Sequence, residues 1–200
     1  MREEKQRQEL ARRLALIDEG ADTGLGVPKR YWGVTLAKTT RIPDNASALD
    51  TVMAWQEDPR GMLMLWGRVG VGKTHFAVAV LHELYLRGCD GLRFLDVAKL
   101  IAALRRQVFD ADLERERIAR EDVLVLDDLG LQGGTDWARE HVVSLISRRE
   151  AEERPTIVTS NLSLEELSKA FDDRLASRLA GGKVIRMGGR DWRLPGEGSR

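Results

Sequence analysis

The sequence has little cysteine and histidine and no long hydrophobic run. One cysteine, Cys89, occurs in 200 residues, so neither an internal disulfide nor a cysteine-rich zinc finger can form. The three histidines, His75, His82 and His141, lack the spacing of metal ligands. No apolar run approaches the roughly 18 residues that a membrane-spanning helix needs, and no signal peptide is recognisable. These absences predict a reduced, cytoplasmic protein with no membrane segment.

The chain also lacks an excess of charge of either sign. It has 32 basic and 32 acidic residues, and 42% of its residues are hydrophobic. A protein that coats nucleic acid is basic throughout, so the charge balance excludes that class but leaves room for a local basic track. Length and composition predict one soluble domain with a substantial core and at most a short appendage.

Short apolar segments alternate with helical segments from residue 61 onward. The predicted strands are 61–66, 92–96, 122–128, 155–161 and 183–187. The predicted helices between and after them are 73–87, 97–109, 137–153 and 163–180. Several strands are apolar without alternation, as in strands that are buried on both faces. The order of elements predicts an α/β fold, with a five-stranded parallel sheet sandwiched by helices.

Two further helices are predicted before this alternation. Residues 2–18 have the pattern of a charged helix. Glycines and a proline in EGADTGLGVPKRY then break the pattern and predict a loop. A second helix is expected to begin after a cap at Asp44 or Asn45 and to end near Gln56.

A glycine-rich loop connects the first predicted strand to the helix that begins at Lys73. Its sequence, GRVGVGKT, matches the phosphate-binding pattern G-x-x-x-x-G-K-[ST]. Backbone N–H groups of such a loop surround phosphate oxygens, and the following helix adds its positive N-terminal end. The candidate nucleotide-binding residues are Gly67, Arg68, Val69, Gly70, Val71, Gly72, Lys73, Thr74 and His75. An ordinary glycine-rich turn is the alternative, but it would need neither lysine nor threonine.

The last two residues of this pattern have distinct chemical roles. The Lys73 ammonium can reach the β- and γ-phosphates, and the Thr74 hydroxyl can ligate Mg²⁺. We expect the Lys73 side chain to point into a solvent-filled loop.

Two carboxylates end the apolar strand in VLVLDDLG. Carboxyl ends of parallel strands face the ligand crevice of such sheets. Asp127 therefore suits Mg²⁺, and Asp128 is placed to orient or deprotonate an attacking water. The alternative is a solvated turn after a core strand.

Polar residues also end the strand in TIVTSN. Thr159, Ser160 or Asn161 can hold the attacking water or the γ-phosphate. A simple strand end before a capped helix is the alternative.

These motifs, in this order, resemble the AAA+ ATPases, and among them the bacterial helicase-loader and IstB group of the DnaC/DnaI type. GRVGVGKTHFAVAV resembles the Walker A motif, VLVLDDLG the Walker B motif and IVTSN the sensor-1 strand. DDRLASRLAGGKVIRMGGRDWR is similar to the arginine-finger helix and final strand. The resemblance covers about residues 25–193 and implies an AAA+ ATPase domain there. The charged helix and linker at 1–24 precede this domain, and the tail LPGEGSR at 194–200 is expected to be disordered.

The resemblance also implies residue roles. Catalytic roles carry over to Asp128 and Asn161, and Arg178 of the SRL sequence becomes the arginine finger that acts in trans on a neighbour's ATP. Arg174, one helical turn earlier, is the weaker candidate. The alternative is that both arginines form a solvated or salt-bridged helix face.

The chain departs from the AAA+ pattern in three places. Many AAA+ proteins have glutamate where Asp128 stands, and the shorter side chain fits slow, switch-like hydrolysis. The residues after KVIRM leave no room for a C-terminal helical lid, so Arg193 is the candidate for the lid's sensor-2 arginine. Finally, loaders carry a helicase-binding domain where this chain has only the helix at 2–18. Either the chain is a fragment, or that helix does the same task.

A local basic track occurs in KLIAALRR, which carries Lys99, Arg105 and Arg106 and no acidic residue. In the initiator and loader group this region resembles a helix that lines a central channel. Its side chains could neutralise phosphates of single-stranded DNA without reading sequence. Ordinary solvated side chains are the alternative.

The resemblance implies a slow ATPase that uses ATP/ADP and Mg²⁺ and acts in DNA replication as a helicase loader. Its expected partners are a replicative helicase, single-stranded DNA and further copies of the same chain.

An IstB-like transposition accessory ATPase is a close alternative. A P-loop small-molecule kinase would need an acceptor-binding insertion and an arginine-bearing lid, neither of which is apparent. A nucleotide-gated adaptor with little hydrolysis is the third alternative.

Overall fold

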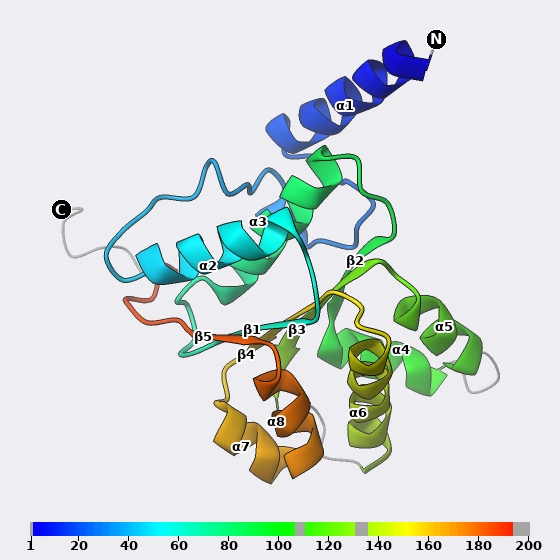
Figure 1. The fold of residues 1–200 in the computed structure, drawn as a ribbon, viewed down its shortest axis with the longest axis vertical. Helices are drawn as coiled ribbons and strands as arrows, with labels where there is room; N and C mark the ends of the chain where they lie inside the picture. Colours follow the sequence, from blue (N-terminus) through cyan, green and yellow to red (C-terminus); the bar gives the residue numbers. More distant parts are fainter. Residues whose placement is uncertain (1, 107–110, 131–135, 194–200) are drawn as a thin grey trace.

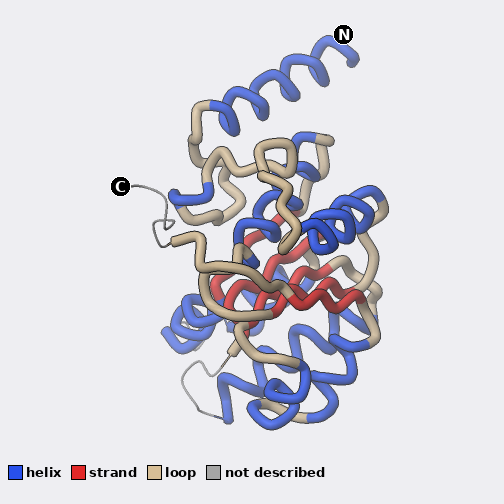
Figure 2. Tube along the Cα trace, turned by 90° about the vertical axis from the view of Figure 1, so that its left-hand side faces the viewer, coloured by secondary structure: helices blue, strands red, loops and turns tan. Residues whose placement is uncertain are grey.

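A five-stranded parallel sheet lies at the centre of the molecule (Figures 1 and 2). The computed structural model describes residues 2–106, 111–130 and 136–193, so the predicted tail at 194–200 is outside it. The strands are β1 (Met62–Trp66), β2 (Leu92–Asp96), β3 (Val123–Leu129), β4 (Thr156–Ser160) and β5 (Lys183–Arg186). Their order across the sheet is β2-β3-β4-β1-β5, and every pairing is parallel. The predicted fold class is confirmed.

Helices cover both faces of this sheet. The first four helical elements of the chain end with the helix that follows the phosphate loop. They are α1 (Arg2–Asp18), the 3₁₀ turn η1 (Lys29–Tyr31), α2 (Ala46–Glu57) and α3 (Lys73–Leu86). The later ones are α4 (Val97–Arg106), α5 (Ala111–Ala119), α6 (Asp136–Ala151), α7 (Leu164–Ala170) and α8 (Asp173–Ala180). Figure 1 shows α2 and α3 on one side of the sheet and α4 to α8 on the other.

Successive residues of each strand supply two separate hydrophobic cores. Leu63 and Leu65 of β1 pack in the core shared with α2 and α3. Met62 and Met64 pack in the other core, with α4 to α8. Because side chains alternate between the faces of a strand, a strand that is covered on both sides must be apolar throughout. This double burial explains why the interior strand β1 has no polar alternation.

The strand order brings together three of the predicted motifs. β1 lies beside β4, and β4 lies beside β3. All strands run in the same direction, so the carboxyl ends of β1, β3 and β4 meet at one edge of the sheet. The phosphate loop, the paired carboxylates and the end of TIVTSN therefore share that edge.

The helix predictions need two corrections. Residues 111–119 form α5, which was not predicted, and its packed residues include Ile118 and Ala119. The predicted helix 163–180 is two helices, because the chain breaks at Asp172. The Asp172 carboxylate accepts a 2.7 Å hydrogen bond from the Leu175 N–H and so caps α8. The segment 107–109, predicted to continue α4, lies outside the described residues.

Helix α1 projects away from the rest of the chain and is attached near its C-terminal end (Figure 1). The Arg13 guanidinium donates to the carbonyl oxygens of Tyr85 (2.8 Å) and Cys89 (3.2 Å) and pairs with Asp90. Ile17 is buried beside this attachment. No helix among residues 2–106, 111–130 and 136–193 is long and apolar enough to cross a membrane.

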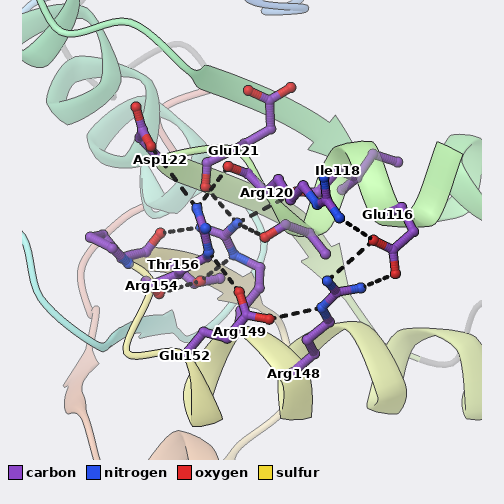
Figure 3. A network of polar contacts seen from close by, with 12 residues as sticks. Glu116, Ile118, Arg120, Glu121, Asp122, Arg148, Arg149, Glu152, Arg154 and Thr156 are labelled. Carbon is purple, nitrogen blue, oxygen red and sulfur yellow. Dashed lines mark hydrogen bonds and ion pairs between the residues drawn. The ribbon is translucent and has the colours of Figure 1, made fainter. Parts of the chain in front are cut away.

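A buried arginine fixes the C-terminal half of α6 to two strand starts (Figure 3). The Arg149 guanidinium donates to the carbonyl oxygens of Ala119 (2.9 Å), Glu121 (2.7 Å) and Pro155 (2.8 Å) and to the Thr156 hydroxyl (2.8 Å). Burial lowers the pKa of Arg149 to about 10. These bonds join α6 to the turn before β3 and to the start of β4, so the position of α6 is set by polar contacts as well as by packing.

Candidate nucleotide site

The phosphate loop follows β1 and has a backbone that only glycine adopts without strain. Gly67, Gly70 and Gly72 have φ angles of 147°, 83° and 97°. A Cβ at Gly67 would collide with the Met187 carbonyl, and one at Gly70 would collide with the Asp191 carboxylate. The glycines thus allow the segment after β5 to lie against the loop, where the Trp192 N–H donates to the Gly70 carbonyl at 3.0 Å.

The remaining loop residues divide into exposed and packed positions. Arg68 and Val69 are exposed, whereas Val71 belongs to the core between the sheet and α3. His75, the last predicted nucleotide contact, bonds through Nε2 to the Thr39 hydroxyl at 2.9 Å. His75 therefore connects the start of α3 to the segment that precedes α2.

Lys73 is buried at the mouth of the loop, with only 8% of its surface exposed. Its Nζ donates three hydrogen bonds of 2.8 Å, to the carbonyl oxygens of Gly67 and Arg68 and to Oδ1 of Asn161. The expectation that this side chain points into a solvent-filled loop is wrong. Neutral oxygens around its ammonium group replace water and compensate for burial of the charge.

Groups around Lys73 shift its pKa in opposite directions. Burial lowers the pKa of Lys73, and the positive charge of Arg193 lowers it further, against the raising effect of Asp128 and Asp127. Arg193 follows Trp192, whose N–H donates to the Gly70 carbonyl, so the C-terminal segment brings a second cation near the phosphate loop.

Asp127 connects the phosphate loop to the end of β3. Its Oδ1 accepts hydrogen bonds from the Thr74 hydroxyl (2.8 Å) and the Thr159 hydroxyl (2.7 Å). Burial raises the pKa of Asp127, the two hydroxyls oppose this, and the Asp128 and Asp96 carboxylates raise it again. The two predicted metal-ligating residues, Thr74 and Asp127, are thus in direct contact.

A bulge in the sheet turns Asp128 away from its neighbour. The register between β3 and β4 shifts between Leu126 and Leu129, and Asp128 has a φ of 61°, in the left-handed region that aspartate tolerates. The backbone N–H of Asp128 donates to the Thr159 hydroxyl at 2.9 Å. As a result, Asp127 is buried while Asp128 is exposed at the edge of the sheet.

Only one of the three polar residues that end β4 faces the site with an exposed side chain. Thr159 and Ser160 are buried, and the Ser160 hydroxyl donates to the Leu129 carbonyl. Asn161 receives the Lys73 bond at Oδ1 and donates through Nδ2 to Oδ1 of Asp128 at 3.0 Å. The amide of Asn161 therefore bridges the loop lysine and the exposed carboxylate.

Arg178 lies at the opposite edge of the sheet from this site. It lines a cavity of about 490 Å³ together with Gly61 and Met62 at the start of β1 and Lys183 at the start of β5. Lys73 follows the other end of β1, so the five residues of that strand, about 16 Å of extended chain, separate the two ends. Arg178 is thus remote from the phosphate loop of its own chain.

Arg178 is also held by α6. Its Nε donates to the Ser147 hydroxyl at 2.9 Å, and its Nη1 is 3.4 Å from a carboxylate oxygen of Glu150. Arg174 lines a second cavity, of about 440 Å³, which also borders Glu150 and Arg178. Within one chain, Arg178 therefore forms a salt bridge, as in the alternative in which the two arginines belong to a salt-bridged helix face.

Two of the three predicted DNA-binding residues are on the solvent side of α4. Lys99 and Arg105 are exposed, while the opposite side of the helix packs in the core with α6. The Arg105 guanidinium lies 5.9 Å from the centre of the Trp137 ring. The side chain of Arg106 lies outside the described part of the structure.

Several contributors to this geometry were not predicted. The Thr159 hydroxyl donates to the Asp127 carboxylate and accepts from the Asp128 N–H, whereas the sequence suggested only that Thr159 could hold water or phosphate. Asp96 pairs in register with Asp127 and caps α4 by accepting from the Lys99 N–H at 2.9 Å. An acid at the end of LRFLD, directly before a helix, is the signal that could have identified Asp96.

Comparison with known proteins agrees with this arrangement. A family model described as "IstB-like ATP binding protein" matches residues 42–181. The replicative helicase loader DnaC of Escherichia coli strain K12 is 28% identical over 123 residues, which are 60% of this chain and 50% of DnaC. An ATP-binding protein of insertion sequence IS1162 from Pseudomonas fluorescens is 39% identical over 105 residues, or 52% of this chain and 45% of that protein.

Similarity of fold extends further along the chain. The crystal structure of the DnaC helicase loader superposes with a TM-score of 0.71 and 27% sequence identity, covering 80% of this chain and 100% of that one. The chain spans about half the length of the curated relatives it matches. The family match covers the phosphate loop, both carboxylates and Asn161, which joins Lys73 to Asp128. The chain therefore belongs to the IstB-like ATP-binding family, within the AAA+ group that includes the DnaC and DnaI helicase loaders.

Proposed function

We propose that the protein hydrolyses ATP slowly and uses the nucleotide to control its assembly on single-stranded DNA and on a replicative helicase. The observation that supports this most strongly is the position of Asn161 between Lys73 and Asp128. One amide contacts both the cation that would hold the γ-phosphate and the carboxylate that would position water. A change at the phosphate can therefore reach the catalytic carboxylate through a single side chain.

Mg²⁺ fits the pair formed by Thr74 and Asp127. A hydroxyl and a carboxylate oxygen 2.8 Å apart are hard oxygen ligands, which Mg²⁺ prefers, and phosphate oxygens would supply others. When bound, the ion would neutralise charge on the β- and γ-phosphates. The Thr159 hydroxyl holds the Asp127 carboxylate in orientation for this task.

Asp128 is the residue we assign to the attacking water. It is exposed at the edge of the sheet, and Asn161 fixes one of its carboxylate oxygens. No described residue hydrogen-bonds to the other oxygen, which we assign to a water proton. A positioned carboxylate of this kind contributes about 10²–10⁴-fold to a rate, and the short aspartate side chain fits a slow enzyme.

The separation of Arg178 from Lys73 supports the proposal of head-to-tail assembly. A group at one edge of the sheet cannot serve the phosphates at the other edge of the same chain. In a head-to-tail array, the Arg178 edge of one copy faces the nucleotide edge of the next. ATP would then join two copies, and Arg178 would act in trans, with Arg174 as the weaker candidate.

Single-stranded DNA is assigned to the solvent side of α4. Lys99 and Arg105 are exposed there and can neutralise phosphates without reading bases. Arg106 is assigned to the same track from its sequence position. The helicase as partner rests on the likeness to a protein named replicative helicase loader.

A transposition accessory ATPase is the second candidate. The 39% identity to an insertion-sequence ATP-binding protein, together with the family description, favours it. Both candidates share the nucleotide chemistry and differ in the protein partner. A small-molecule kinase would transfer the γ-phosphate to a metabolite. An adaptor with little hydrolysis would keep it on the bound nucleotide.

An ATPase assay with and without single-stranded DNA separates these functions. We expect slow release of phosphate that single-stranded DNA accelerates. Binding of the ATP-loaded protein to a hexameric replicative helicase, measured by size-exclusion chromatography, would favour the loader over the transposition protein. Transfer of phosphate to a metabolite, or binding of ATP without turnover in the presence of DNA and helicase, would contradict the proposal.

A further inference from the structure

The guanidinium of Arg178 is only partly occupied by contacts within its own chain. Two of its five N–H groups are engaged, through Nε with Ser147 and through Nη1 with Glu150. Among the described residues no hydrogen bond or ion pair engages the other three. The two contacts come from one face of α6, because Ser147 and Glu150 are three residues apart. A phosphate could therefore bind to Nη2 while Ser147 keeps the guanidinium in place.

The Arg178–Glu150 pair lies between two open cavities. One, of about 490 Å³, is lined by Arg60 and Lys183 as well as by the pair. The other, of about 440 Å³, is lined by Asp173 and Arg174. The guanidinium is thus reachable from outside the chain, and 34% of the Arg178 side chain is exposed.

The geometry of the Arg178–Glu150 pair is that of a weak ion pair. Its distance of 3.4 Å is long for a charged hydrogen bond, and both side chains are about a third to two-fifths exposed. A phosphate with two or more negative charges can compete with such a carboxylate. The carboxylate nevertheless offsets the positive charge that the arginine presents to a transition state.

The helix that carries Glu150 cannot easily move aside. Arg149, the preceding residue, is bound to Ala119 by a buried hydrogen bond and to Glu121 and Pro155 by partly buried ones. Glu150 is therefore held beside Arg178 by the core of the protein. Relief of the pairing must come from the side chains, not from displacement of α6.

We propose that Glu150 restrains the arginine finger, holding Arg178 in a charge-compensated position until the phosphate of a neighbouring copy displaces the carboxylate. This inference rests on the proposed function, since it assigns the finger to Arg178. Ser147 orients the guanidinium in both states. Glu150 acts on the reaction through Arg178 and is a positioning residue.

The test is the steady-state ATPase activity of Glu150→Gln in the full chain with single-stranded DNA. Glutamine keeps an oxygen that accepts from Arg178 but removes the charge. We expect kcat to rise about two- to fivefold, the range of an exposed ion pair, with KM for ATP unchanged. Glu150→Ala should change kcat in the same direction. The matched control is Glu153→Gln, which removes a carboxylate from the same cavity without a contact to Arg178 and should leave kcat unchanged.

A double variant separates this inference from the proposed function. In the Arg178→Ala background, Glu150→Gln should have no effect on kcat, because a restraint needs the finger. Unchanged or lower kcat in both Glu150 variants, or a rise that persists without Arg178, would overturn the restraint. If Arg178→Ala alone keeps the full rate, the trans-acting finger of the proposed function is wrong instead.

Discussion

The Lys73 ammonium donates a 2.8 Å hydrogen bond to Oδ1 of Asn161, which lies 88 residues further along the chain. This contact joins the phosphate loop after β1 to the end of β4, and the same amide reaches Asp128. Three groups from three strand ends thus form one polar chain. Substitutions at its two ends, Lys73 and Asp128, are expected to affect nucleotide binding and hydrolysis separately.

Replacement of Lys73 by alanine should remove tight ATP binding. Loss of a charge-assisted contact to phosphate weakens affinity by at least about 10-fold. Because Lys73 is buried, the carbonyls of Gly67 and Arg68 also lose their donor, so we expect the free energy of unfolding to fall by about 1–3 kcal/mol. Fluorescent-nucleotide titration and urea unfolding measure the two effects. A folded variant with normal ATP affinity would refute the site.

Replacement of Asp128 by asparagine should separate binding from turnover. Asparagine keeps an oxygen for the Asn161 contact and tolerates the left-handed backbone at this position. We expect near-normal ATP affinity and turnover at least ~10-fold slower, because the carboxylate no longer takes a water proton. Single-turnover phosphate release is the measurement. Equal rates for the variant and the wild-type protein would show that Asp128 does not position water.

The strand pattern and the nucleotide motifs were predictable because they depend on local sequence. Each strand was predicted from an apolar run followed by glycine, aspartate or asparagine. The same residues predicted that the site forms at the carboxyl ends of the strands. Thr159 was not predictable as an organiser of Asp127, because its role depends on the bulge in β3. The burial of Lys73 was missed for a similar reason, since Asn161 covers it from a distant part of the chain.

Helix details escaped prediction where tertiary contacts decide them. In α5 the sequence ADLERERIA is mostly charged, and Ile118 and Ala119 of this helix pack in the core. The break at Asp172 was visible as a capping residue, but the apolar spacing continued across it. Nothing in SRREAEE distinguishes the buried Arg149 from the half-exposed Arg148.

Arg149 should contribute far more to stability than its neighbour Arg148. Replacement of Arg149 by methionine leaves several buried carbonyl oxygens without donors, including those of Ala119 and Glu121. At about 1–3 kcal/mol for each orphaned group, we expect a loss of at least about 3 kcal/mol in the free energy of unfolding. Arg148→Met, the matched control, removes surface ion pairs and should cost much less. Similar losses for the two variants in urea unfolding would contradict the assigned role.

Stability should fall below neutral pH because of His82. Its Nδ1–H donates to the Val34 carbonyl at 2.7 Å, and its buried Nε2 has no partner among the described residues. Burial lowers the pKa of His82 below 6.5, against the raising effect of that bond. Between the folded and the unfolded pKa, the unfolded state binds more protons. The free energy of unfolding should therefore fall by about 1.4 kcal/mol per pH unit as the pH decreases from about 6.5, and level off below the folded pKa.

The comparison of wild type with His82→Leu isolates this titration. Their difference in free energy of unfolding should change with pH between 7.5 and 5. A pH-independent difference for His82→Leu would show that His82 does not lose its proton on folding.

The most direct test of head-to-tail assembly is a mixture of two inactive variants. Lys73→Ala lacks the nucleotide site and Arg178→Ala lacks the finger, but one intact site can form where the two chains meet. An arginine finger contributes ~10³–10⁵-fold to the rate in GTPases, and the lower end is expected in a slow ATPase. With single-stranded DNA present and co-assembly demonstrated, we predict that the mixture recovers a measurable part of the wild-type ATPase rate. A co-assembled mixture that stays as inactive as each variant alone would contradict completion of the site by a neighbouring copy.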